Sequence, residues 1–98
     1  MRQWFQFETK NDVQLMRIFL PGAQAVFSTR HGGCSVPPFD TMNLAFHVGD
    51  KPGDVADNRK RFTAAADIPL DSVVCACQVH GTNIEVVDSL DRGRGVYS

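Results

Sequence analysis

Two side chains with catalytic potential, Gln78 and His80, lie at the end of a short β-branched run that starts at Val73 and stops before Gly81. Side chains alternate between the two faces of a strand, so Gln78 and His80 would point the same way. An imidazole at a strand end can ligate a metal or transfer a proton. A single histidine is more often an ordinary hydrogen-bonded residue, so the assignment depends on the surrounding sequence.

The three cysteines are an odd number and favour a reducing compartment. Cys75, Cys77 and His80 spell C-x-C-x-x-H, a spacing that suggests zinc, but strand alternation would turn both thiols away from the imidazole. We interpret Cys75 and Cys77 as small buried hydrophobic residues.

The composition predicts one small cytoplasmic domain. The chain has 98 residues, 43% of them hydrophobic, and a formal net charge of -1, which gives no general attraction to nucleic acid or to a membrane. No apolar run approaches the roughly 20 residues that cross a bilayer, and the first residues lack the apolar centre of a signal peptide.

Alternating apolar patterns predict several strands that would position the polar side chains. A long loop with two prolines follows the third of them and extends to Met42. Asn43, Ala45 and His47 would share one strand face that either lines a pocket or is simply half-exposed. The predicted strands are residues 4–7, 13–20, 23–30, 43–48, 73–80 and 83–88.

The clearest helix is predicted to start at Pro52 and to end before Pro69. Asp50 or Lys51 would form its N-terminal cap. Its buried stripe would carry Arg59 among apolar residues, and a buried arginine needs an anionic partner, either a structural carboxylate or a substrate phosphate.

Four motifs across about 60 residues resemble, in order and spacing, the YfiH/YlmD family. That family was first described as a laccase-like multicopper polyphenol oxidase and is associated with purine nucleoside phosphorylase and adenosine deaminase activity. The motifs are residues 27–33, 42–50, 58–59 and 78–81.

The resemblance implies an α+β fold, a four-layer α/β/β/α sandwich with mixed sheets. Residues 1–98 would form the N-terminal part of a single YfiH-like domain, apparently truncated. The resemblance also implies zinc, with His80 as one protein ligand and as the catalytic residue. The family's other two ligands belong to later Ala-Asp-Cys and His-Ala-Gly-Trp-Arg-Gly segments, which this sequence does not contain.

By the same resemblance, the substrates would be phosphate and the nucleosides adenosine, inosine and guanosine. Arg30 and Arg59 are candidates to bind phosphate, and Asn43 and Gln78 to hydrogen-bond ribose or base; a structural role for each stays open. Alternatives are a copper-dependent polyphenol oxidase, which three histidines serve poorly, and a non-catalytic binding module. Homo-oligomers, or association through unpaired sheet edges, are also expected.

Overall fold

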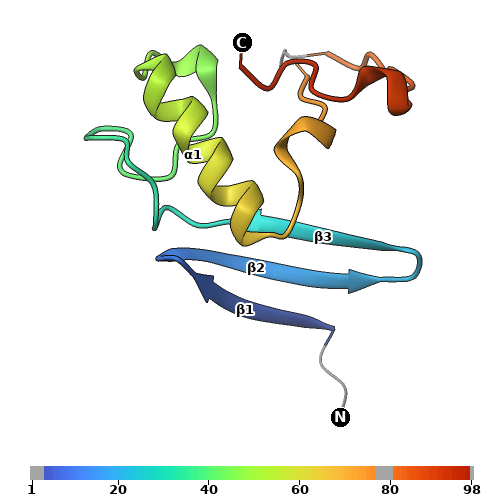
Figure 1. Ribbon diagram of the computed structural model, residues 1–98, viewed down its shortest axis with the longest axis horizontal. Helices are drawn as coiled ribbons and strands as arrows, with labels where there is room; N and C mark the ends of the chain where they lie inside the picture. Colours follow the sequence, from blue (N-terminus) through green and yellow to red (C-terminus); the bar gives the residue numbers. More distant parts are fainter. Residues whose placement is uncertain (1–3, 77–80, 98) are drawn as a thin grey trace.

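The computed structural model describes residues 4–76 and 81–97. A three-stranded sheet precedes one long helix, and three short 3-10 turns complete the elements (Figure 1). The fold is therefore a small α+β arrangement. The elements are β1 (Phe5–Lys10), β2 (Val13–Leu20), β3 (Ala23–Ser28), η1 (Phe46–Val48), α1 (Pro52–Ala65), η2 (Leu70–Ser72) and η3 (Ser89–Asp91).

The sheet is an antiparallel meander in the order β1-β2-β3. Lys10 pairs with Val13 across the first turn and Leu20 with Ala23 across the second. Asn11 and Asp12, both at positive φ, make the first turn, and Gly22 at φ 71° contributes to the second. The three strands predicted before residue 31 are confirmed, but within the described residues this sheet is antiparallel rather than mixed.

α1 begins where the sequence predicts. Lys51 is the N-terminal cap residue, Pro52 occupies the first turn and Asp54 adds negative charge there. The amides of Asp54 and Val55 both donate to the carbonyl of Lys51, at 3.0 and 3.1 Å. The helix ends at Ala65, a few residues before Pro69.

The hydrophobic core lies between β2 and the C-terminal end of α1. Val13 and Leu15 are at most 1% exposed and project from one face of β2. Ala65 and Ala66 pack against them from the helix, and Met42 packs from the preceding loop. The core is small, with five buried apolar residues, so polar contacts are also needed to hold the neighbouring loops in place.

The glycine pair after β3 is required by close backbone packing. A Cβ atom on Gly32 would lie 2.4 Å from the carbonyl oxygen of Asp12, and one on Gly33 would lie 2.1 Å from that of Thr41. Gly32 also has φ 97°. These glycines therefore let the long loop cross the β1–β2 turn.

Three of the predicted strands are wrong where the structure describes them. Residues 43–45 are not in a strand, residues 46–48 form the 3-10 turn η1, and residues 83–88 have no strand partner among the described residues. Residues 73–76 are not in a strand either, although the amide of Cys75 donates to the carbonyl of Arg94 and that of Gly93 to Val73, at 2.9 and 2.8 Å. The remainder of the last predicted strand, residues 77–80, lies outside the described residues.

Within residues 4–76 and 81–97, one face of the sheet has no covering layer. α1 and the described segments that follow it lie on the side of Val13 and Leu15 (Figure 1). The strand pairing places an apolar set on the opposite side, and Phe7 and Phe27 are 64% and 54% exposed there. We call this set the open face; its members are Phe5, Phe7, Met16, Ile18, Leu20, Ala23, Ala25 and Phe27.

No helix within residues 4–76 and 81–97 combines the length and the apolar character needed to cross a membrane.

Candidate functional site

A pocket of about 330 Å³ lies where the end of β3, the segment before η1 and the middle of α1 meet. Among residues 4–76 and 81–97, its wall carries one cationic side chain, Arg59, one imidazole, His47, and no carboxylate. Asn43, Ala45 and His47, expected to share one face, do line it together although they are not on a strand. The lining residues are Ser28, Met42, Asn43, Leu44, Ala45, His47, Arg59 and Ala76.

Asn43 is held by the protein at both ends of its amide. Its Nδ2 donates to the carbonyl of Ala45 at 3.2 Å and to Oδ2 of Asp50 at 3.1 Å, and its Oδ1 accepts from the amide of Ala45 at 3.1 Å. These bonds fix the turn that forms one wall of the pocket. Asn43 therefore has the structural role that the sequence analysis left open, since it stabilises this turn.

Behind this wall lies a buried polar network that the sequence did not predict. Asn58 is fully buried: its Nδ2 donates to Oγ of Ser35 at 2.8 Å and to the carbonyl of Asn43 at 2.9 Å, and its Oδ1 accepts from the amide of Cys34 at 2.8 Å. Ser35 in turn donates to Asp50. A polar residue on the apolar stripe of α1 is the signal that could have revealed this network.

Asp50 is ionised within this network. The hydrogen bond from the Ser35 hydroxyl, followed by those from Asn43 and from the amide of Lys51, lowers the pKa of its carboxyl group against the opposing effect of burial. The charge thus supports the loop and the start of α1 together.

Arg59 reaches three backbone carbonyls. Its Nε donates to Leu44 at 2.9 Å, and its Nη1 donates to Gly95 at 2.8 Å and to Val96 at 3.0 Å. The guanidinium carbon lies 4.4 Å from the centre of the Phe46 ring. Among the described residues, backbone carbonyls rather than the expected anion accept the hydrogen bonds of these donors. Arg59 therefore links α1 to both the pocket wall and the C-terminal segment.

His47 and Ser28 are the polar lining residues not held in this way. No hydrogen bond joins the His47 imidazole or the Ser28 hydroxyl to another part of residues 4–76 and 81–97. His47 is exposed on η1, whose last residue precedes Gly49 at φ 97°. Sequence analysis placed His47 on a polar face but did not select it as a site residue.

Arg30 is not brought to this pocket. Its side chain is 68% exposed, and its Nη2 lies 2.8 Å from Oδ2 of Asp40. Its carbonyl accepts from the amides of Thr41 and Met42, at 2.9 and 3.1 Å, which closes the long loop at its base. Arg30 therefore shapes this loop on a different part of the surface from Asn43 and Arg59.

The other two expected site residues, Gln78 and His80, lie outside the described residues. Ala76, two positions before Gln78, lines the pocket. Within residues 4–76 and 81–97, no three His, Cys, Asp or Glu side chains come together as a metal-binding group.

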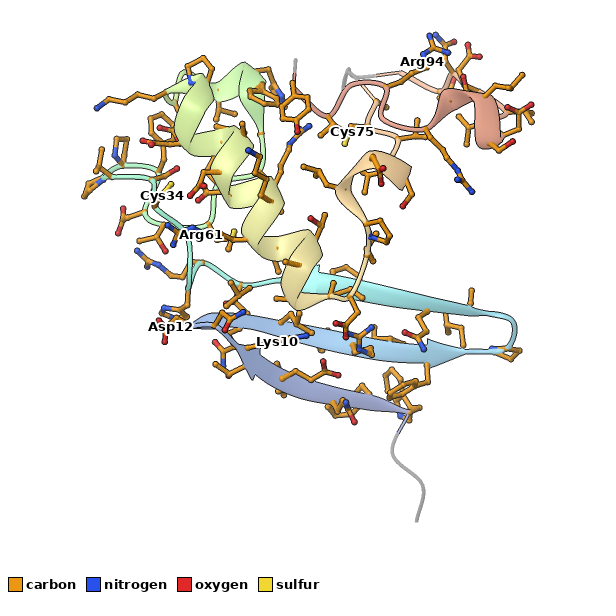
Figure 2. All side chains as sticks on the ribbon, in the orientation of Figure 1. Lys10, Asp12, Cys34, Arg61, Cys75 and Arg94 are labelled. Carbon is orange, nitrogen blue, oxygen red and sulfur yellow. The ribbon has the colours of Figure 1, made fainter. Side chains whose placement is uncertain are left out.

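Two cysteines are free thiols that lie far apart in the fold. Figure 2 shows Cys34 beside α1 and Cys75 on the segment that follows the helix. Burial and the neighbouring Asp57 raise the pKa of Cys34, so its thiol stays protonated near neutral pH. Both side chains are half-buried, whereas Cys75 was expected to be a buried hydrophobic residue.

A second, wider concavity of about 650 Å³ opens on the α1 side of the sheet. Its centre is the ion pair of Arg17 with Glu8, 2.9 Å between Nε and Oε2, and Arg17 also donates to the carbonyl of Ala66. The hydrogen bond from Arg17 lowers the pKa of Glu8. This pair joins β1, β2 and the end of α1.

Comparison with known families identifies the chain. It belongs to the family described as multi-copper polyphenol oxidoreductase laccase, which matches residues 24–97. The relatives below place it with the YfiH and YlmD proteins, so the family expected from the four motifs is confirmed.

Three similar proteins all bear the name purine nucleoside phosphorylase. One from Mycobacterium tuberculosis is 56% identical over 63 residues, 64% of this chain and 25% of that protein. YlmD of Geobacillus stearothermophilus is 46% identical over 74 residues, 76% and 27% of the two chains. YfiH of Escherichia coli is 48% identical over 63 residues, which are 64% of this chain and 26% of that protein. The match thus spans about a quarter of each relative's length.

Two solved structures share the fold. The crystal structure of YlmD from Geobacillus stearothermophilus has a TM-score of 0.84 at 39% identity, covering 98% of this chain and 36% of that one. A YfiH protein from Bacillus licheniformis has a TM-score of 0.78 at 32% identity, covering 93% and 34%. The described arrangement therefore occurs as part of larger proteins.

Proposed function

We propose that this chain contributes to a purine nucleoside phosphorylase, with adenosine deaminase activity at the same centre. The observation that carries the proposal is family membership together with the shared name of the relatives. The names favour phosphorolysis over the phenol oxidation in the family description. The pocket wall supports it with a cation and no carboxylate, which suits an anionic co-substrate.

The reaction would transfer a ribosyl group to phosphate. The bond between ribose C1′ and the purine nitrogen breaks, a bond from C1′ to a phosphate oxygen forms, and the purine takes up a proton. Asn43 shapes the pocket wall and Arg59 supplies positive charge, and Gln78 would hydrogen-bond ribose or base. Arg30 lies outside this pocket, paired with Asp40, and stays a phosphate-binding candidate on the sequence motif alone.

For the metal, we propose zinc with His80 as one protein ligand and as the catalytic residue. By the family resemblance, the other two ligands would come from the later Ala-Asp-Cys and His-Ala-Gly-Trp-Arg-Gly segments, which this sequence does not contain. A zinc ion with an open position polarises water or an oxyanion, which is the chemistry that deamination requires. Copper is the alternative that the family description favours.

We further propose that residues 1–98 form the N-terminal part of one YfiH-like domain with a four-layer sandwich architecture. The open face supports this, since α1 covers only one side of the sheet and the other is apolar and uncovered. A second sheet packed there would place β layers inside and helices outside. A cytoplasmic location, without nucleic acid or membrane partners, fits the composition.

The test is phosphate-dependent cleavage of inosine, adenosine and guanosine by the purified protein. We expect free base and ribose 1-phosphate in equal amounts, no cleavage without phosphate, and ammonia from adenosine. Base release at an unchanged rate without phosphate would indicate a hydrolase and contradict the proposal. Release of no base by a folded protein that also contains the other two metal ligands would contradict it as well.

A further inference from the structure

The pocket beside α1 contains polar groups that the fold itself does not use. The Nδ2 and Oδ1 atoms of Asn43 are both hydrogen-bonded within the protein, and the Nε and Nη1 atoms of Arg59 donate to backbone carbonyls. The His47 imidazole and the Ser28 hydroxyl have no hydrogen bond within residues 4–76 and 81–97. Both side chains are exposed, so each can exchange its bound water for a ligand that enters the pocket.

The chemistry of these groups selects an anion. An imidazole has at least one N–H donor in either protonation state, and a hydroxyl can rotate to donate. Arg59 adds a positive charge, and no Nη2 bond of its guanidinium to the described residues is present. Among the described residues the lining contains no carboxylate, so no side chain of the wall itself offsets the charge of Arg59.

The two groups come from different elements that line the same pocket. Ser28 is the last residue of β3 and pairs with Leu15, so its side chain lies on the α1 side of the sheet. His47 lies at the centre of η1, which Arg59 holds through the Leu44 carbonyl and the Phe46 ring. The volume of about 330 Å³ accommodates a tetrahedral anion with room for a larger group beside it.

We propose that His47 and Ser28 bind inorganic phosphate in this pocket, with Arg59 providing the positive field. The choice of phosphate among oxyanions rests on the proposed phosphorolysis. The site itself rests on the unbonded donors and the charge of the wall. His47 would thus be a direct substrate contact that the sequence motifs did not single out.

The test is a titration of the protein with inorganic phosphate at constant ionic strength, followed through the histidine resonances in NMR spectra. We expect a saturable shift of the His47 signals and none at His31, which is exposed outside the pocket. His47→Phe should weaken phosphate binding about tenfold and Ser28→Ala about fivefold, since each loses a hydrogen bond to a charged acceptor. His31→Phe is the matched control and should bind like the wild type.

Shifts that grow without saturation and equally at both histidines would show an adventitious ion only and overturn the proposal. Unchanged affinity in His47→Phe would overturn it too. A parallel inosine titration separates this inference from the proposed function. Phosphate binding at His47 without cleavage of any nucleoside would support the phosphate site and refute the proposed function. Nucleoside cleavage with phosphate bound away from His47 would support the function and refute the phosphate site.

Discussion

At the scale of single residues, the polar side chains near the pocket divide into those that build it and those that face it. Asn43 was predicted from the sequence to contact ribose or base, but its side-chain amide forms hydrogen bonds with Ala45 and Asp50. The sequence motif around it identified the right place. It could not reveal the bonding, because Asp50, Asn58 and Ser35 meet only after the chain has folded.

The first prediction concerns the pH dependence of stability at Asp50. Its pKa is lower in the folded protein than the reference value of 3.8, so its contribution is present above that value and is lost as pH falls through the folded pKa. Asp50→Asn should be less stable than wild type at neutral pH, and the difference should shrink as acid protonates the wild-type carboxyl. Urea unfolding between pH 7 and pH 2.5 measures this.

Asp71→Asn, at an exposed position, is the control and should stay close to wild type at neutral pH. A stability difference between wild type and Asp50→Asn that stays constant down to the lowest pH would contradict the proposed ionised network.

At the scale of elements, local patterns predicted the meander and α1, and tertiary contacts decided the rest. The paired strands have alternating apolar residues and turn residues between them, and α1 has Pro52 and Asp54 at its start. Residues 83–88 have a comparable β-branched pattern but no neighbouring strand among the described residues, and Ile84 and Val86 are 91% and 93% exposed. Strand propensity without a partner in space does not make a strand.

The second prediction concerns Arg59 as the link between elements. Arg59→Met should lower the free energy of unfolding by about 2–3 kcal/mol, because hydrogen bonds to three carbonyls and the contact with Phe46 are lost. Amide hydrogen exchange should accelerate most in residues 93–96. Chemical denaturation and exchange mass spectrometry measure the two effects.

Arg61→Met is the matched control on the same helix. Arg61 pairs only with Asp57, 2.8 Å away in an exposed i,i+4 contact, so its loss should cost roughly 0.5 kcal/mol or less. Equal destabilisation by both substitutions would contradict the linking role of Arg59.

At the scale of the whole molecule, the open face is the feature that most needs a partner. The ionisable side chains of the three strands, Glu8, Lys10 and Arg17, all belong to the α1 side, which leaves the opposite side without charge. Solved relatives with the same arrangement are nearly three times as long. Individual apolar residues of the sheet were predictable, but which side α1 covers depends on the register of all three strands.

The third prediction is that the protein self-associates through this face when no other layer covers it. Sedimentation velocity should show larger species as concentration rises, and Phe7→Lys with Phe27→Lys should shift the distribution to the monomer, because a lysine in the interface would lose its hydration. Val36→Lys replaces an equally exposed apolar residue off the sheet and should leave association unchanged. A wild type that remains monomeric at all concentrations would refute this prediction.

The central claim is that this chain provides a metal ligand to a phosphorylase centre, and zinc content per chain tests it most directly. Wild type, His80→Ala and His31→Ala would be purified identically without chelators and measured by elemental analysis. In protein that also contains the other two ligand segments, the account predicts near-stoichiometric zinc in wild type and in His31→Ala, and its loss in His80→Ala. Zinc retained in His80→Ala, or absent from wild type, would contradict it.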